Sequence, residues 1–244
     1  MLNAPGRPGV VSKMFRAVTT LIVILSTAAI ISTAAIISPA AIAAPAADQP
    51  PAALLSGKAA RGAAIDPVFA HFKVDKLSCK FTEEKRIALL ARPLRSAGTI
   101  YFARDRGIAR ITETPKPQQV VLTKTTLKIK KGDHVEEIPL DKSKDLKAFA
   151  LIFPTLLRGE RAELEKAFDM TLYGSEADWW ALAFTPKTDS LKAMVKRVVL
   201  YGKKGDLFSL QVTEANGDTT DTRLTQLSKN AEVKDTDLTT AFGA

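Results

Sequence analysis

Apolar and polar residues alternate along short segments from residue 77 to residue 227. A period of two is typical of strands that bury one face. Gly, Asp and Asn residues separate several of these segments, as they do in hairpin turns. The predicted strands cover residues 77–83, 96–104, 108–114, 119–124, 126–131, 134–140, 168–173, 179–185, 196–201, 207–213 and 219–227.

One stretch interrupts the strands with helical spacing. Between residues 144 and 158, apolar side chains recur every three to four positions and also occupy the opposite side. A helix that is apolar nearly all round needs cover on more than one side. Pro154 should kink or end this helix, and a second short helix is predicted over residues 160–167. Another helix should start near Asp66, because Pro67 suits the first helical position.

These elements predict a mainly β (α+β) fold, in which a long antiparallel sheet curls around an apolar helical pair. Two interpretations stay open. The inner face of the sheet forms either a cavity suited to acyl chains or an ordinary filled core, and periodicity does not separate them. In the first case, the candidates for lipid contact are Ile100, Phe102, Ile108, Phe149, Phe153, Trp180, Leu182, Phe184, Leu200 and Leu210.

The first 43 residues have the layout of a secretory signal peptide. Arg7, Lys13 and Arg16 precede an uncharged run over residues 17–37, and an Ala-Ile-Ala sequence at 41–43 provides the small residues that a signal peptidase requires. The alternative is an uncleaved membrane anchor, because about 20 apolar residues can span a bilayer. The run is rich in Ala and Thr, whose insertion is weak, which favours cleavage and export.

The rest of the chain has the length of one domain. Residues 44–64 are rich in Ala and Pro and predict a flexible linker, which leaves residues 65–244 as the folded domain. The formal net charge of +9 falls to +6 when the three basic residues of the signal are removed. This balance favours anionic surfaces such as acidic headgroups, and we expect no binding of nucleic acid. Cys79 is the only cysteine, so no intrachain disulfide can form, and we expect it to be buried.

The chain carries no recognisable catalytic motif. It lacks a G-x-S-x-G elbow, an H-E-x-x-H pair and a Gly-rich phosphate loop, and its two histidines, His71 and His134, lie in unrelated segments. Adjacent acidic pairs such as Glu83 and Glu84 point to opposite faces of a strand, so solvated charge is their predicted role. We therefore expect no enzyme, no metal site and no cofactor.

Several segments occur in an order that is similar to their order in a known family. They are FTEEK at 81–85, LLARPLRSAGTIYF at 89–102, the Arg-to-Pro segment at 104–115, LLRG at 156–159 with Leu164 and Phe168, FTPK at 184–187, and Asn230 with Phe242. This order resembles the LolA-like periplasmic lipoprotein carriers over the whole of the predicted domain. Each motif alone is degenerate, and their order and spacing carry the resemblance.

The resemblance implies an incomplete antiparallel β-barrel closed by short helices, which carries acylated cargo through the periplasm. It implies that Arg104 is a latch that holds the helical lid closed until cargo opens it. It also implies an inner-membrane export complex and an outer-membrane acceptor as partners of a monomeric carrier. Arg110 stands where the family usually has an aromatic residue, so the cargo is either a lipoprotein or a related lipid or glycolipid. A membrane-tethered domain that senses lipid, with a regulatory or structural role, is the alternative function.

Overall fold

The computed structural model describes residues 49–142 and 144–243. Within these residues, twelve strands form one antiparallel sheet. The strands are β1 Ala59–Ala60, β2 Lys76–Arg86, β3 Leu94–Ala103, β4 Gly107–Thr114, β5 Gln118–Leu122, β6 Thr126–Lys131, β7 His134–Pro139, β8 Phe168–Gly174, β9 Trp179–Pro186, β10 Val195–Lys203, β11 Asp206–Glu214 and β12 Thr219–Lys229. Each strand predicted from the alternating pattern is present, with ends that differ by a few residues.

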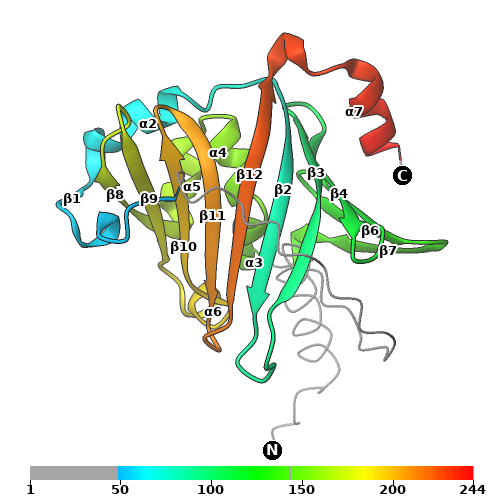
Figure 1. Cartoon of the computed structure of the whole chain (residues 1–244), viewed down its shortest axis with the longest axis horizontal. Coiled ribbons are helices and arrows are strands. Elements are labelled where there is room, and N and C mark those ends of the chain that lie inside the picture. The colour runs from blue at the N-terminus through cyan, green and yellow to red at the C-terminus, as the bar shows by residue number, and fades with distance from the viewer. Residues whose placement is uncertain (1–48, 143, 244) are drawn as a thin grey trace, which may run out of the picture.

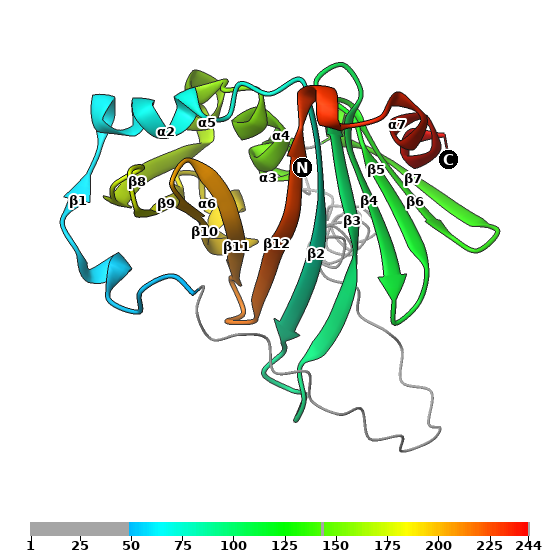
Figure 2. The same cartoon turned by 45° about the horizontal axis from the view of Figure 1, so that its top comes forward.

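The sheet is a curled but open barrel. Its strand order is β1-β8-β9-β10-β11-β12-β2-β3-β4-β5-β6-β7, so β1 and β7 form two edges that do not pair with each other. Figure 1 shows the strands fanning out along the length of the molecule, and Figure 2 shows the sheet wrapping around the central helices. The predicted incomplete antiparallel β-barrel is confirmed.

Short helices occupy the concave side of this sheet. The chain leaves β7 at one edge and reaches β8 near the other edge through α3, α4 and α5, so these helices cross the inside of the curl (Figure 2). The α-helices are α2 Asp66–Ala70, α3 Lys144–Ala150, α4 Ile152–Leu157, α5 Arg161–Ala167, α6 Asp189–Lys192 and α7 Asp235–Phe242, and the 3-10 helices are η1 Leu54–Ser56, η2 Gly62–Ile65, η3 Leu140–Lys142 and η4 Asn230–Glu232.

The apolar helix predicted over 144–158 is two helices. The break lies at Leu151, whose backbone leaves the helical region, and Pro154 is the third residue of α4. The first turn of a helix has no intrahelical acceptors for its N–H groups, so a proline there loses no hydrogen bond. Pro154 therefore lies inside a helix because the helix restarts just before it.

Residues 44–64 were predicted to form a flexible linker, but the second half of this segment forms short elements in the structure. Residues 1–48, which include the predicted signal peptide, lie outside the described part of the chain. From Leu54 onward the chain forms η1, the short strand β1 and η2, and β1 pairs with β8. Leu54 and Leu55 pack on Ala181, Ala183 and Val199 on the outer face of the sheet. Partial burial of these two leucines helps to hold this Ala-rich segment against the sheet.

The C-terminal helix α7 was not predicted from the sequence. It covers the outer face of β3, β4 and β5, where Ala241 packs with Ala109 and Val121. Leu238 packs with Ala103 in an adjacent cluster. Only two residues of α7 are buried, so the helix lacks the broad apolar stripe that sequence patterns detect.

Candidate functional site

An apolar cavity lies between the concave face of the sheet and the helices α3 and α4, which we call the lid helices. Its volume is about 100 Å³. The wall comes from β3 to β6 on one side and from β10 to β12 on the other. The residues that line it are Ile100, Ile108, Arg110, Val120, Leu122, Leu127, Phe149, Ala150, Ile152, Phe153, Val198, Leu200, Leu210, Val212, Thr222 and Leu224.

Six of the ten predicted lipid-contact residues line this cavity. They are Ile100, Ile108, Phe149, Phe153, Leu200 and Leu210. The sequence prediction missed the contributions of β5, β6 and β12 to the wall. On β6 and β12 the inward residues alternate with polar ones, so a signal for these two strands was present in the sequence. On β5 the outward Val121 is also apolar, so the pattern there is weaker.

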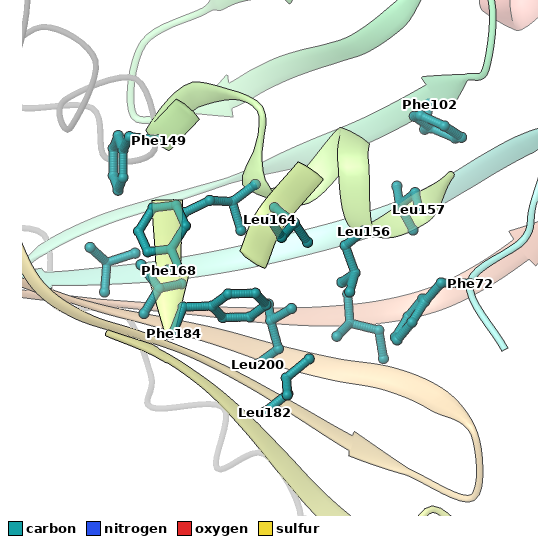
Figure 3. Close-up of a cluster of buried hydrophobic side chains, with 14 of the residues drawn as sticks. Phe72, Phe102, Phe149, Leu156, Leu157, Leu164, Phe168, Leu182, Phe184 and Leu200 are labelled. Atoms are coloured by element: carbon teal, nitrogen blue, oxygen red, sulfur yellow. The ribbon is translucent and has the colours of Figure 1, made fainter. Parts of the chain in front are cut away.

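The other four predicted residues do not line the cavity. Phe102, Trp180, Leu182 and Phe184 are fully buried in the packed part of the core. The Trp180 ring meets Phe72 edge to face at 5.8 Å, and Phe184 meets Phe168 in the same way at 6.1 Å. Figure 3 shows side chains of α4 and α5, including Leu156 and Leu164, among these buried side chains. Both interpretations of the inner face therefore hold, each for a different part of it.

The cavity is small for an acyl chain. An apolar cavity of about 150 Å³ is enough to hold benzene and stays dry when empty. The present volume of about 100 Å³ is smaller than that and far below the volume of a full fatty-acyl tail. Phe149, Ala150, Ile152 and Phe153 form its helical wall, so an outward movement of the lid helices is the change that enlarges it.

Arg104 lies directly after β3, and its side chain donates hydrogen bonds to three residues in two parts of the chain. Its Nε donates to Asp75 at 2.6 Å, its Nη2 donates to the carbonyl of Val74 at 3.0 Å, and its Nη1 donates to the carbonyl of Arg158 at 3.4 Å. Arg158 is the C-cap of the lid helix α4. The guanidinium thus joins the end of α4 to the segment that precedes β2. This position suits the predicted latch, whose function stays a prediction.

A buried ion pair lies beside the apolar wall, where the sequence predicted solvated charge. Arg110 donates from Nη1 and Nη2 to the two carboxylate oxygens of Glu83 at 3.1 and 3.0 Å, and each residue is only 5% exposed. Thr222 and Ser96 also donate hydroxyl hydrogen bonds to Glu83. The Arg110 guanidinium covers the Phe81 ring at 4.1 Å. The prediction for Glu83 is therefore wrong, because the curl of the sheet turns its face inward.

A second buried ion pair extends this polar layer. Lys85 Nζ lies 2.6 Å from Glu214 Oε1, and both side chains are buried. On β2 the inward residues run from Leu77, Cys79 and Phe81 to Glu83 and Lys85, so the inner face changes from apolar to charged along one strand. The strand alternation alone places Glu83 on the face of Phe81, and that signal could have identified the buried pair.

The described residues offer neither a metal site nor a membrane-spanning helix. No group of three or more His, Cys, Asp or Glu side chains within 49–142 and 144–243 is arranged to hold a metal ion. None of the helices in the same residues has the length and apolar character needed to cross a bilayer.

The chain is similar to several known proteins. No individual protein with a curated description matches the sequence. A LolA superfamily protein from Nitrosomonas europaea has 10% identity and a TM-score of 0.39, over 72% of this chain and 97% of that one. A putative outer membrane lipoprotein-sorting protein domain from Vibrio parahaemolyticus has 9% identity and a TM-score of 0.35, over 68% and 89%. The MucA/MucB complex structure from Pseudomonas aeruginosa has 15% identity and a TM-score of 0.40, over 70% and 58%.

The family model described as "Outer membrane lipoprotein carrier protein LolA-like" matches residues 57–242. This range contains all twelve strands, the lid helices and α7. The match begins eight residues before the domain start predicted from the sequence, within the segment that places η1 and β1 against the sheet. The chain belongs to the LolA-like family of outer membrane lipoprotein carrier proteins.

Proposed function

We propose that this protein is a periplasmic carrier that binds the acyl chains of lipoproteins, or of a related lipid or glycolipid, and moves them towards the outer membrane. The observation that carries the proposal is the apolar cavity between the sheet and the lid helices, whose wall is aliphatic and aromatic except at Arg110 and Thr222. Such a wall suits hydrocarbon and offers no group for a chemical reaction. The proposal therefore includes no catalytic step.

Acyl burial can supply the free energy that opens the lid. Burying one methylene contributes about 0.8 kcal/mol. The three hydrogen bonds from Arg104 are worth roughly 1–3 kcal/mol each, because the donor is charged. Transfer of about ten methylenes into an enlarged cavity thus offsets the loss of these bonds. In this mechanism the cargo opens the lid, and the Arg104 contacts form again when the cargo leaves.

The test measures binding of a fluorescent fatty acid by the purified full chain. Replacing Leu210 with Trp places a larger side chain in the cavity, so we expect the affinity to fall at least roughly tenfold. Ser209→Trp is the matched control, because Ser209 pairs with the outward residues Tyr201 and Arg223 on the opposite face of β11. Equal loss in both variants, or no uptake by the unaltered chain, contradicts the carrier proposal. Native mass spectrometry of the chain isolated from cells then identifies the lipid.

A tethered lipid-sensing domain is the second candidate, because residues 17–37 form an uncharged run that is long enough to span a bilayer. A protein that remains attached to the inner membrane does not cross the periplasm with cargo. N-terminal sequencing of the exported protein separates the two functions. Loss of the residues up to Ala43 supports the carrier, and retention of the run supports the tethered domain.

A further inference from the structure

The turn between β2 and β3 carries an exposed apolar tip. Among the described residues, the large hydrophobic side chains that are exposed are Leu89 at 94%, Val135 at 45% and Leu90 at 38%. Leu89 and Leu90 are neighbours at the end of one hairpin, and Ala88 and Ala91 beside them are exposed too. Exposed leucines of this kind, gathered at a protruding point, are unusual on a surface that meets only water.

Arginines surround this tip. Arg86 and Arg92 flank the turn, and Arg95 follows on β3. The side chains of Arg86 and Arg95 are 67% and 77% exposed, and both contact Glu84, at 2.5 and 3.1 Å. Three guanidinium groups against one carboxylate leave the hairpin end with a formal charge of +2. Exposed leucines with arginines beside them form a combination that binds an anionic lipid surface.

The base of the hairpin is attached to the barrel. The backbone N–H of Ala88 donates to Asp218 Oδ1 at 3.0 Å, and Asp218 is itself buried in the β11–β12 turn. The Lys85–Glu214 ion pair lies just below, between the same two hairpins. Leu90 N–H donates to the carbonyl of Ile87 and closes the turn. These bonds direct the leucines outward and prevent them from folding back onto the sheet.

We propose that the tip formed by residues 87–93 docks the protein on a lipid bilayer that contains anionic headgroups. The two leucines enter the boundary between headgroups and acyl chains, while the arginines contact the phosphates. Membrane docking of this kind is compatible with a carrier and with a tethered domain, so it does not depend on the function proposed above.

The position of the tip sets the orientation of the docked molecule. The β2–β3 turn lies at the lower end of the sheet in Figure 1, and Arg104 follows the other end of β3. A strand of ten residues is roughly 33 Å long. The turn between β8 and β9 lies at the same end as Arg104, because β9 begins opposite the end of β10. That turn should therefore remain in water when the tip is in the membrane.

The test uses local probes, because residues 17–37 are apolar and could hold the full chain on vesicles by themselves. An environment-sensitive fluorophore is attached to Ala91→Cys at the tip or to Ala177→Cys at the β8–β9 turn. The native thiol of Cys79 is 1% exposed, so we expect it not to react in the folded protein. Vesicles contain phosphatidylcholine alone or equal parts of phosphatidylcholine and phosphatidylglycerol.

We expect the probe at position 91 to shift to the blue on anionic vesicles and the probe at position 177 to stay unchanged. Leu89→Asp should weaken the response of the tip probe by at least roughly tenfold, and Arg92→Gln should weaken it by a smaller factor. The proposal is overturned if position 91 stays in water on anionic vesicles, as it would for a tip that fits only a protein pocket. A Leu89→Asp variant with unchanged response, or an equal shift at position 177, also overturns it.

Discussion

The environment of Glu83 depends on the whole barrel and not on its own strand alone. On the isolated strand its neighbour Glu84 suggests a solvated acidic pair, and Glu84 is indeed at the surface with Arg86 and Arg95. Glu83 faces inward, where Arg110 supplies both charge and bidentate geometry. Arg110 lies 27 residues after Glu83, on another strand of the sheet. Two residues that are far apart in the sequence form one buried unit.

Breaking this pair should be far more costly than replacing it. Glu83→Ala leaves the Arg110 charge buried without its carboxylate, so we expect a loss of about 3–5 kcal/mol in the free energy of unfolding. The double variant Glu83→Leu with Arg110→Met removes both charges and keeps the volume, and its stability should stay within about 1 kcal/mol of the original. Urea unfolding measures both values. Equal stabilities for the single and double variants would falsify the assignment of this contact as a coupled buried pair.

At the scale of elements, the lid is held at its two ends in different ways. Phe149 and Phe153 from the lid helices meet the cavity, whereas Leu156 and Leu157 at the end of α4 are fully buried in the packed core. Arg104 adds its hydrogen bond to the carbonyl of Arg158 at that same end. The break at Leu151 separates this packed end of α4 from α3.

Arg104→Leu should slow the release of a bound acyl chain more than it changes uptake. The three hydrogen bonds of Arg104 form again as the cargo leaves, so their loss removes part of the driving force for release. We expect release to slow by roughly tenfold, which corresponds to about 1.4 kcal/mol. Stopped-flow transfer of a fluorescent fatty acid to acceptor vesicles measures both rates. Arg106→Leu is the control from the same turn, and unchanged transfer in Arg104→Leu removes the latch from the mechanism.

At the scale of the whole molecule, the inner face of one sheet is divided between a filled and a hollow part. The aromatic side chains of Phe72, Phe168, Trp180 and Phe184 fill the side near β8 and β9. Branched aliphatic residues dominate the side near β4, β5 and β6, and the lid helices leave the cavity open there. The large rings thus provide a rigid packed region, and the cavity lies where smaller side chains face the lid.

The reactivity of the Cys79 thiol should indicate whether the sheet has unfolded. Burial raises the pKa of its thiol from 9.0 to about 12. Between pH 9 and pH 12 the folded state therefore holds a proton that the unfolded state has lost, so stability is intact below pH 9 and falls as the pH rises towards 12. We expect no alkylation by iodoacetamide at pH 8 in the native protein and rapid alkylation in urea. Native labelling at the unfolded rate, or stability that rises from pH 9 to pH 12, contradicts this.

Much of the fold followed from local patterns. The alternation around Ile100, Leu182 and Leu200 predicted the strands, and the spacing over 144–158 predicted an apolar helical segment between them. The family resemblance added the closure by helices. The pattern missed α7, because Leu238 and Ala241 alone do not make a detectable apolar face.

By itself, the sequence determined which residues face the same side of each strand, because the period of a strand is a property of the local backbone. It also determined the charge and the order of the elements. Only the tertiary structure decided that Leu210 borders a cavity while Leu182 is packed, and that Glu83 meets Arg110. Those outcomes depend on how the sheet curls and where the helices cross it, and they arise from contacts between residues that are distant in the chain.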